Sequence, residues 1–180
     1  ELWHSRATTV DYAPATFFYA APGATVSVKP DPDAAKVPVK RAVEPEGVKG
    51  ALEGEKFKVL AKTGGETEVQ DVADWHWSRG GQLWWLDAKV GDKLTLEFSV
   101  KKAGRYQVFA ELTKAPDYGI VQIDINGNKS EKPLDRYFTS VAHDPIPLGE
   151  FELKQGPNQL TAEIVGSNEK AIKRHMFGLD

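Results

Sequence analysis

The chain has 180 residues, of which 41% are hydrophobic, and this is enough to bury a core in one domain without disulfides. The chain has 23 basic and 26 acidic residues and a net charge of −3. The two kinds of charge are mixed along the sequence, so there is no stretch of basic residues of the kind that binds nucleic acid. Cysteine is absent, which excludes disulfides, thiolate metal sites and a cysteine nucleophile. No apolar run approaches the ~20 residues of a membrane-spanning helix, so we expect neither nucleic acid nor a membrane as partner.

The first segment, residues 1–28, predicts two strands and a turn. Residues 15–20 form a short aromatic and β-branched run, and Pro22-Gly23 ends it. Because two strands alone are marginal in water, we expect this pair to belong to the end of a preceding β domain. The one methionine is Met176, so we interpret the chain as a piece of a longer protein.

Residues 29–50 have a different composition, rich in proline and charge and without a sustained period of 2 or 3.6 residues. Proline favours extended backbone and removes amide donors, which predicts a linker that runs as a strap over a surface. Simple disorder of this segment is the alternative.

From residue 51 onward, polar and apolar residues alternate with the period of a β-strand. The clearest run is 93–100, where one face is apolar and the other polar. Asn126-Gly127 predicts a two-residue hairpin turn. The predicted strands are 51–60, 67–72, 83–87, 93–100, 104–112, 118–125, 146–153, 159–165 and 172–179.

Many short strands at roughly 8–12-residue spacing, with Gly, Pro and Asn between them, are typical of an antiparallel sandwich or barrel. A helical period is nowhere sustained. We therefore predict an all-β fold in which residues 51–180 form an antiparallel jelly-roll β-sandwich, preceded by the strand pair and the Pro-rich linker.

Four of the five tryptophans lie between residues 74 and 85. In a strand, Trp84 and Trp85 point to opposite faces, so at least one of them belongs to the core. Trp75 and Trp77 share a side of an extended segment that precedes a glycine loop. Such rings serve either packing or stacking on the flat face of a sugar, and both interpretations stay open. Hydroxyl partners for a sugar would come from Asp74, Arg79 and Gln82.

The order of features from Ala51 onward resembles the calcium-binding jelly-roll carbohydrate-binding modules of the galactose-binding-like superfamily. The likeness is carried by residues 52–55, 98–108, 121–127, 148–158 and 178–180. The resemblance implies that Tyr118 and Asn168 lie near the ligand face, although both also suit turns. It further implies that Glu53, Glu55 and Asp180 share a structural calcium ion, with solvated strand carboxylates as the alternative.

Residues 12–24, together with 176–180, resemble the late part of a bacterial glycoside hydrolase group, family 172, that includes difructose-dianhydride synthase and arabinofuranosidases. This resemblance implies a secreted or periplasmic bacterial protein in which residues 1–28 end a catalytic domain. Carboxylates on the late strands of that domain approach its active site, which would make Glu1 and Asp11 the candidate catalytic residues.

These features lead to three hypotheses about function. The first is a non-catalytic carbohydrate-associated module that binds glycan through Trp75, Trp77 and Tyr118, with Asp74, Arg79 and Asn168 orienting hydroxyls. The second is a structural module whose tryptophans contact the catalytic domain or a second copy. The third is a fragment of a glycoside hydrolase that uses Glu1 and Asp11. The four histidines have no metal-ligand spacing, so we assign no metal to them. No cofactor is established by the sequence, and a structural calcium ion is expected only from the resemblance.

Overall fold

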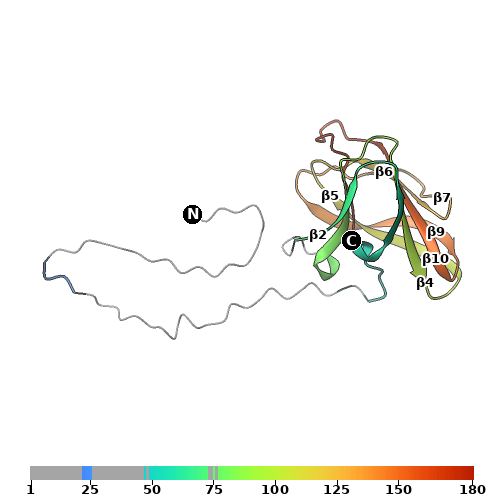
Figure 1. Cartoon of the computed structure of the whole chain (residues 1–180), viewed down its shortest axis with the longest axis horizontal. Helices are drawn as coiled ribbons and strands as arrows, with labels where there is room; N and C mark the ends of the chain where they lie inside the picture. Colours follow the sequence, from blue (N-terminus) through green and yellow to red (C-terminus); the bar gives the residue numbers. More distant parts are fainter. Residues whose placement is uncertain (1–21, 26–46, 48, 73–74, 76) are drawn as a thin grey trace. The chain divides into compact units, whose positions relative to one another are not determined.

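The computed structural model describes residues 22–25, 47, 49–72, 75 and 77–180 (Figure 1). The chain divides into two compact units, Glu1–Val43 and Glu44–Asp180. In the first unit the described residues are 22–25, where Pro22-Gly23 forms a turn. The rest of the predicted strand pair and most of the Pro-rich linker lie outside the described residues, as do Glu1 and Asp11.

The second unit is a sandwich of two antiparallel sheets, which confirms the predicted all-β jelly-roll class. The described residues form a six-stranded sheet in the order β1-β4-β10-β6-β7, with β8 also paired to β6, and a five-stranded sheet in the order β2-β3-β11-β5-β9. The first contains β1 (Lys58–Lys62), β4 (Lys93–Val100), β6 (Ile120–Ile125), β7 (Asn128–Lys129), β8 (Leu134–Asp135) and β10 (Gly156–Gly166). The second contains β2 (Glu66–Asp71), β3 (Gly81–Leu86), β5 (Gly104–Lys114), β9 (Ala142–Leu153) and β11 (Phe177–Leu179).

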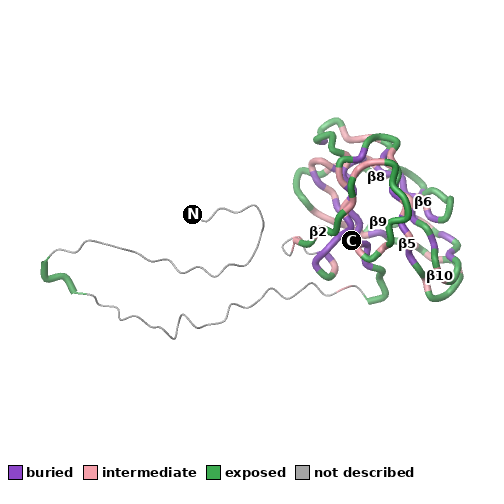
Figure 2. The backbone as a smooth tube through the Cα atoms, in the orientation of Figure 1, coloured by how far each residue is buried: buried purple, intermediate pink, exposed green. Residues whose placement is uncertain are grey.

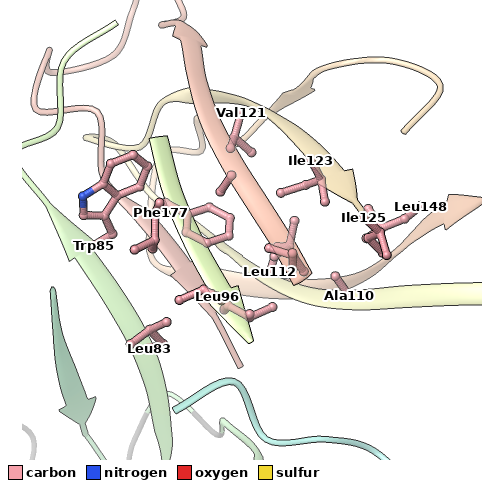
Figure 3. Close-up of a cluster of buried hydrophobic side chains, with 14 of the residues drawn as sticks. Leu83, Trp85, Leu96, Ala110, Leu112, Val121, Ile123, Ile125, Leu148 and Phe177 are labelled. Carbon is pink, nitrogen blue, oxygen red and sulfur yellow. The ribbon is translucent and has the colours of Figure 1, made fainter. Parts of the chain in front are cut away.

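The core lies between the two sheets because alternate side chains of each strand point inward. In β4, Leu94, Leu96 and Phe98 are buried, and residues between them are more exposed. Figure 3 shows Trp85 and Phe177 of one sheet packed toward Val121 and Ile123 of the other. Figure 2 shows the same alternation of buried and exposed residues along the strands, and the mostly exposed edge strand β2.

The tryptophan pair in β3 confirms the strand-parity prediction. Trp85 is fully buried in the main core, and its Nε1 donates a hydrogen bond of 2.9 Å to the carbonyl oxygen of Gly64. Trp84 points to the opposite face and packs there on a second, smaller cluster that contains Tyr118 and Met176. The two neighbouring rings therefore belong to different layers of the molecule.

Two predicted strands begin five or more residues later than expected. Residues 51–57 contain the 3-10 helix η2 (Gly54–Lys56) instead of the start of a strand. A Cβ on Gly54 would lie 2.4 Å from the carbonyl oxygen of Leu179, so the chain crosses closely past β11 at this glycine. The strand predicted over 172–179 begins at Phe177, because the amides of Ile172 and Met176 bond to the 115–119 loop instead of to a sheet neighbour.

The predicted hairpin turn is present between β6 and β7. Asn126 and Gly127 have φ values of 53° and 87°, the left-handed pair that this two-residue turn requires. Among the described residues, no helix has the length and apolar character needed to cross a membrane.

Replacing Leu96 by alanine tests the position of the core. Leu96 is fully buried in β4, so we expect Leu96→Ala to lower the free energy of unfolding by ~2–5 kcal/mol. Val165→Ala is the matched control, since Val165 is 39% exposed on the neighbouring strand β10, and should cost less than ~1 kcal/mol. Urea unfolding measures both, and equal losses would contradict the described core.

Candidate functional site

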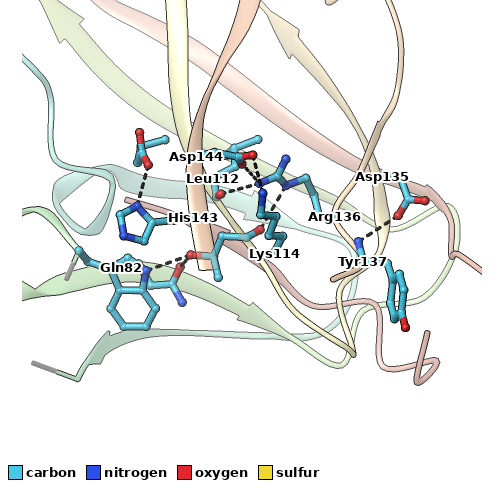
Figure 4. A network of polar contacts seen from close by, with 11 residues as sticks. Gln82, Leu112, Lys114, Asp135, Arg136, Tyr137, His143 and Asp144 are labelled. Carbon is cyan, nitrogen blue, oxygen red and sulfur yellow. Dashed lines mark hydrogen bonds and ion pairs between the residues drawn. The ribbon is translucent and has the colours of Figure 1, made fainter. Parts of the chain in front are cut away.

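A buried polar network lies on the outer face of the five-stranded sheet and includes Gln82 (Figure 4). Thr113 Oγ1 donates to Gln82 Oε1 at 2.6 Å and accepts from Trp77 Nε1 at 3.0 Å. Gln82 Nε2 donates to Gln70 Oε1 at 2.7 Å and to the Tyr118 hydroxyl at 3.3 Å. These bonds connect β2, β3 and β5 with two loops, so the network fixes the loops to the sheet.

The structure brings Trp77 and Tyr118 together through this network, but as interior residues. Trp77 is 0% and Tyr118 is 4% exposed. Burial raises the pKa of the Tyr118 phenol, which therefore remains protonated. Neither ring presents an open face, and this differs from the expected stacking platform. The physical reason is that both polar handles, the indole N–H and the hydroxyl, find partners on the sheet.

Trp75 is half-buried, and its ring meets that of Trp77 edge to face, with centroids 5.1 Å apart and planes at 79°. An edge-to-face pair is a packing geometry and is not a coplanar platform for a sugar. Asp74 lies outside the described residues. Arg79 has a left-handed φ of 51° and its Nε lies 3.2 Å from Glu53 Oε1. Arg79 is therefore paired with one of the predicted calcium ligands.

Asn168 occupies a different environment, in the loop between β10 and β11. Its Nδ2 donates to Asp135 Oδ2 at 2.7 Å, and its Oδ1 accepts from the amide of Lys170 at 3.0 Å. Asp135 Oδ1 in turn accepts from the amide of Tyr137 at 2.9 Å. The structure therefore joins Asn168 to a loop that our sequence prediction did not single out.

Two aromatic side chains follow Asp135. Tyr137 is half-buried and forms a parallel bridge with Ala115, and Phe138 is 42% exposed with Lys114 Nζ 5.0 Å from its ring centroid. We call Asp135, Tyr137, Phe138 and Asn168 the loop-end site. Residues 135–138 carry no periodicity that marks them in the sequence. The hydrogen bond between Asn168 and Asp135 joins Asn168 to this segment, and Phe138 is included by its position in the chain.

Arg136 anchors the loop-end site, because its guanidinium is buried although Asp135 before it is exposed and Tyr137 after it is half-buried. Arg136 is 4% exposed; its Nη2 donates to the carbonyl oxygen of Leu112 at 2.7 Å, and its Nε donates to that of Thr113 at 3.3 Å (Figure 4). It also pairs with Asp144. Burial by itself would raise the pKa of Asp144, but hydrogen bonds from Lys114 and Arg136 hold that pKa below its ordinary value.

We use the name carboxylate cluster for Glu53, Glu55 and Asp180, the three carboxylates predicted to share calcium. Glu53 and Asp180 are each 8% exposed. Asp180 Oδ2 accepts from the amide of Ser78 at 2.9 Å. Four buried oxygens have no hydrogen-bond partner among the described residues, and they are Glu53 Oε2, Glu55 Oε2, Ser78 Oγ and Asp180 Oδ1. A buried oxygen without a partner raises the free energy of the folded state. A hydrogen-bond donor or a positive charge at these four oxygens would therefore stabilise it.

The chemistry of these donors fits a calcium ion, which prefers carboxylate and other oxygen ligands. In the described part of the chain, however, no three His, Asp or Glu side chains are already gathered as a metal-binding group. Arg79 instead supplies one cation to Glu53. If calcium binds here, Glu53, Glu55 and Asp180 would hold it, and it would neutralise buried charge.

No family model matches the chain, and no curated protein matches it. Among solved structures, it is similar to a xanthan lyase from Paenibacillus, with a TM-score of 0.65 and 23% identity over 76% of this chain. The chain spans 13% of that protein's length. At this identity the likeness shows a shared fold.

Two carbohydrate-binding modules also match, each with a TM-score of 0.40. The family 35 module from Clostridium thermocellum is 18% identical, with 71% of this chain and 96% of the module covered. The C-terminal family 6 module of a laminarinase from Zobellia galactanivorans is 11% identical, with 71% of this chain and 91% of the module covered.

The environment of Asp180 predicts a pH-dependent stability. Burial raises the pKa of Asp180 to about 6, with Glu111 and Glu53 adding to the rise while the Ser78 amide and His143 oppose it. Between about pH 4 and about pH 6 the folded state binds the Asp180 proton more tightly than the unfolded state does. The free energy of unfolding should therefore fall as pH rises through this range, by up to ~3 kcal/mol. Urea unfolding in chelator from about pH 4.5 to about pH 7.5 measures this slope.

In the variant Asp180→Asn the side chain at position 180 cannot titrate, so the dependence of stability on pH should flatten. Glu169→Gln is the control, because Glu169 is exposed in the β10–β11 loop and should leave the slope unchanged. A slope that persists in Asp180→Asn would assign the pH dependence to another group.

Proposed function

We propose that the chain is a non-catalytic, carbohydrate-associated module of a larger exported bacterial protein, and that it binds glycan at the loop-end site. The observation that carries the proposal is the hydrogen bond between Asn168 and Asp135, a residue that Tyr137 and Phe138 follow in the chain, on loops anchored by the buried Arg136. Fold likeness to a small part of a xanthan lyase supports the association with polysaccharides.

The loop-end site offers both kinds of contact that sugars use. The hydrogen bond from Asn168 Nδ2 to Asp135 Oδ2 orients both side chains. It uses one of the two Nδ2 hydrogens, so the second hydrogen of Asn168 and the other lone pairs of the Asp135 carboxylate can bond to sugar hydroxyls. The exposed ring of Phe138 can meet the C–H face of a pyranose. Loops fixed on a rigid sandwich reduce the ordering cost of binding. Binding thus depends on residues 135–138 and 168 together.

Removing the amide or the aromatic face should weaken binding. We expect Asn168→Ala and Phe138→Ala each to reduce affinity about tenfold, the effect of losing ~1.4 kcal/mol. Calorimetric titration of the folded chain against a panel of neutral and acidic polysaccharides measures the affinity. Gln155→Ala is the control, because Gln155 is exposed in the turn between β9 and β10. If the folded chain binds none of the panel, glycan recognition is excluded for it.

The burial of Trp77 and Trp85 favours a second candidate function, that of a structural module. In this role the sandwich would support a neighbouring domain or a second copy, and the tryptophans would stabilise the module from inside. It predicts no glycan binding by the folded chain, together with a loss of stability of the larger protein when this module is deleted.

We also propose that the carboxylate cluster binds calcium as a structural ion. A ligand at about 100 times its Kd adds ~2.7 kcal/mol to the folded state, which for a domain of this size raises Tm by ~5–10 °C. Thermal unfolding in calcium and in chelator measures the shift. Glu53→Gln and Asp180→Asn should abolish the shift, whereas Glu169→Gln should retain it. Identical Tm values in calcium and chelator would contradict the ion.

A further inference from the structure

We propose that Asn126 is a site of spontaneous covalent modification, deamidation to aspartate or isoaspartate, and that hydrogen bonds around the folded turn slow this reaction. The chain has four asparagines, at positions 126, 128, 158 and 168, and of these only Asn126 is followed by glycine. Glycine has no side chain to shield its backbone nitrogen, so an Asn-Gly pair offers the most accessible nucleophile for this reaction. Neither the loop-end site nor the carboxylate cluster contributes a residue to the turn.

The reaction needs no partner other than water. The backbone nitrogen of Gly127 attacks Cγ of Asn126, so that a new C–N bond forms and the Cγ–Nδ2 bond breaks. The amide proton of Gly127 leaves with the Nδ2 group as ammonia, and the product is a five-membered succinimide. Water then opens this ring at either carbonyl group and gives aspartate or isoaspartate. Asn126 and Gly127 are both exposed, so water reaches the turn.

The first obstacle to the attack is the position of the Asn126 carboxamide, which is bonded at both ends to β10. Its Nδ2 donates to Asn158 Oδ1 at 2.9 Å, and its Oδ1 accepts from the amide of Gln159 at 2.9 Å. The amide of Asn126 also donates to the carbonyl oxygen of Gln159 at 3.0 Å. Before Nδ2 can leave as ammonia, the carboxamide must break both of its side-chain bonds.

Asn158 is itself held in place, so it cannot follow the carboxamide when the turn moves. It is 1% exposed, and its Oδ1 also accepts from the amide of Lys154 at 3.1 Å. Its Nδ2 donates to the carbonyl oxygens of Lys154 and Gly156, each at 2.9 Å. Asn158 therefore joins the turn between β9 and β10 to the turn between β6 and β7.

The second obstacle is at the nucleophile. The amide of Gly127 donates to Asp124 Oδ1 at 2.7 Å, and a hydrogen bond to an ionised carboxylate is stronger than one between neutral groups. The nitrogen must give up this proton during the attack, and the negative charge of Asp124 opposes that step. The two reacting groups are thus held by different partners, Asn158 and Gln159 for one and Asp124 for the other.

Both obstacles consist of local hydrogen bonds. The turn can therefore become reactive by opening alone, while the core between the two sheets stays packed. The rate of deamidation at Asn126 should follow the strength of these particular bonds and should be insensitive to equal losses of stability elsewhere in the module.

The experiment incubates the full 180-residue chain in mildly alkaline buffer and locates the exchange of NH2 for OH by tandem mass spectrometry. We expect Asn126 in the folded chain to react about 100-fold more slowly than in the same chain unfolded in urea. Asp124→Ala and Asn158→Ala should each accelerate the folded chain about tenfold. Asp124→Asn keeps an oxygen acceptor without the charge, so its rate should lie between those of Asp124→Ala and the wild type.

Asp92 provides the matched control, because it makes the same kind of bond in the turn between β3 and β4. Its Oδ2 accepts from the amide of Lys89 at 2.7 Å, also three residues away. Asp92→Ala should leave Asn126 as slow as in the wild type. Urea unfolding of each variant shows how much stability it has lost.

Three results would overturn the inference. The first is equal rates at Asn126 in the folded and the urea-unfolded wild type, a comparison that needs no variant. The second is an acceleration in Asp92→Ala as large as that in Asp124→Ala, since the reaction would then depend on unfolding of the whole module. The third is a wild-type rate in both Asp124→Ala and Asn158→Ala.

Discussion

The three residues of β11 are the constraint on which the rest of the sandwich depends. This strand pairs with β3 on one side and with β5 on the other, and so joins the two halves of the five-stranded sheet. Gly178 at its centre leaves room for the Gln82 side chain, since a Cβ there would lie 2.1 Å from Gln82 Oε1. Its end delivers Asp180 to the cluster beside Ser78 and Glu53. The short strand β11 therefore joins the two parts of the sheet, leaves space for the Gln82 side chain and positions Asp180 in the carboxylate cluster.

The two candidate sites differ in how their polar groups are satisfied. In the loop-end site, Asp135 and Asn168 bond to each other and to backbone amides, so the group is ordered yet partly open to solvent. In the carboxylate cluster, buried oxygens outnumber their donors. The first arrangement leaves polar groups near solvent, and the second leaves buried oxygens without partners among the described residues. In the buried network, Gln82 and Thr113 bond to each other and to Gln70, Trp77 and Tyr118.

Strand positions followed well from the sequence where one face is buried. The alternation over 93–100 reproduces β4, and Asn126-Gly127 forms the turn between β6 and β7. Residues 51–57 and 172–176 were predicted as strands because their polarity fits one. Neither segment is a strand, because contacts with distant residues hold it in another conformation. Gly54 packs closely against Leu179, and the amides of Ile172 and Met176 bond to the carbonyl oxygens of Pro116 and Asp117.

The sequence by itself determined the fold class and the opposite directions of Trp84 and Trp85. These follow from period-2 burial and from residue chemistry, which are local properties. Only the tertiary structure decided that Trp77 is interior, that Asn168 belongs with Asp135, and that Arg136 points inward. Each of these depends on a partner 33 or more positions away, or on carbonyl groups of another strand, and hydrogen-bond pairing across such separations has no periodic signature.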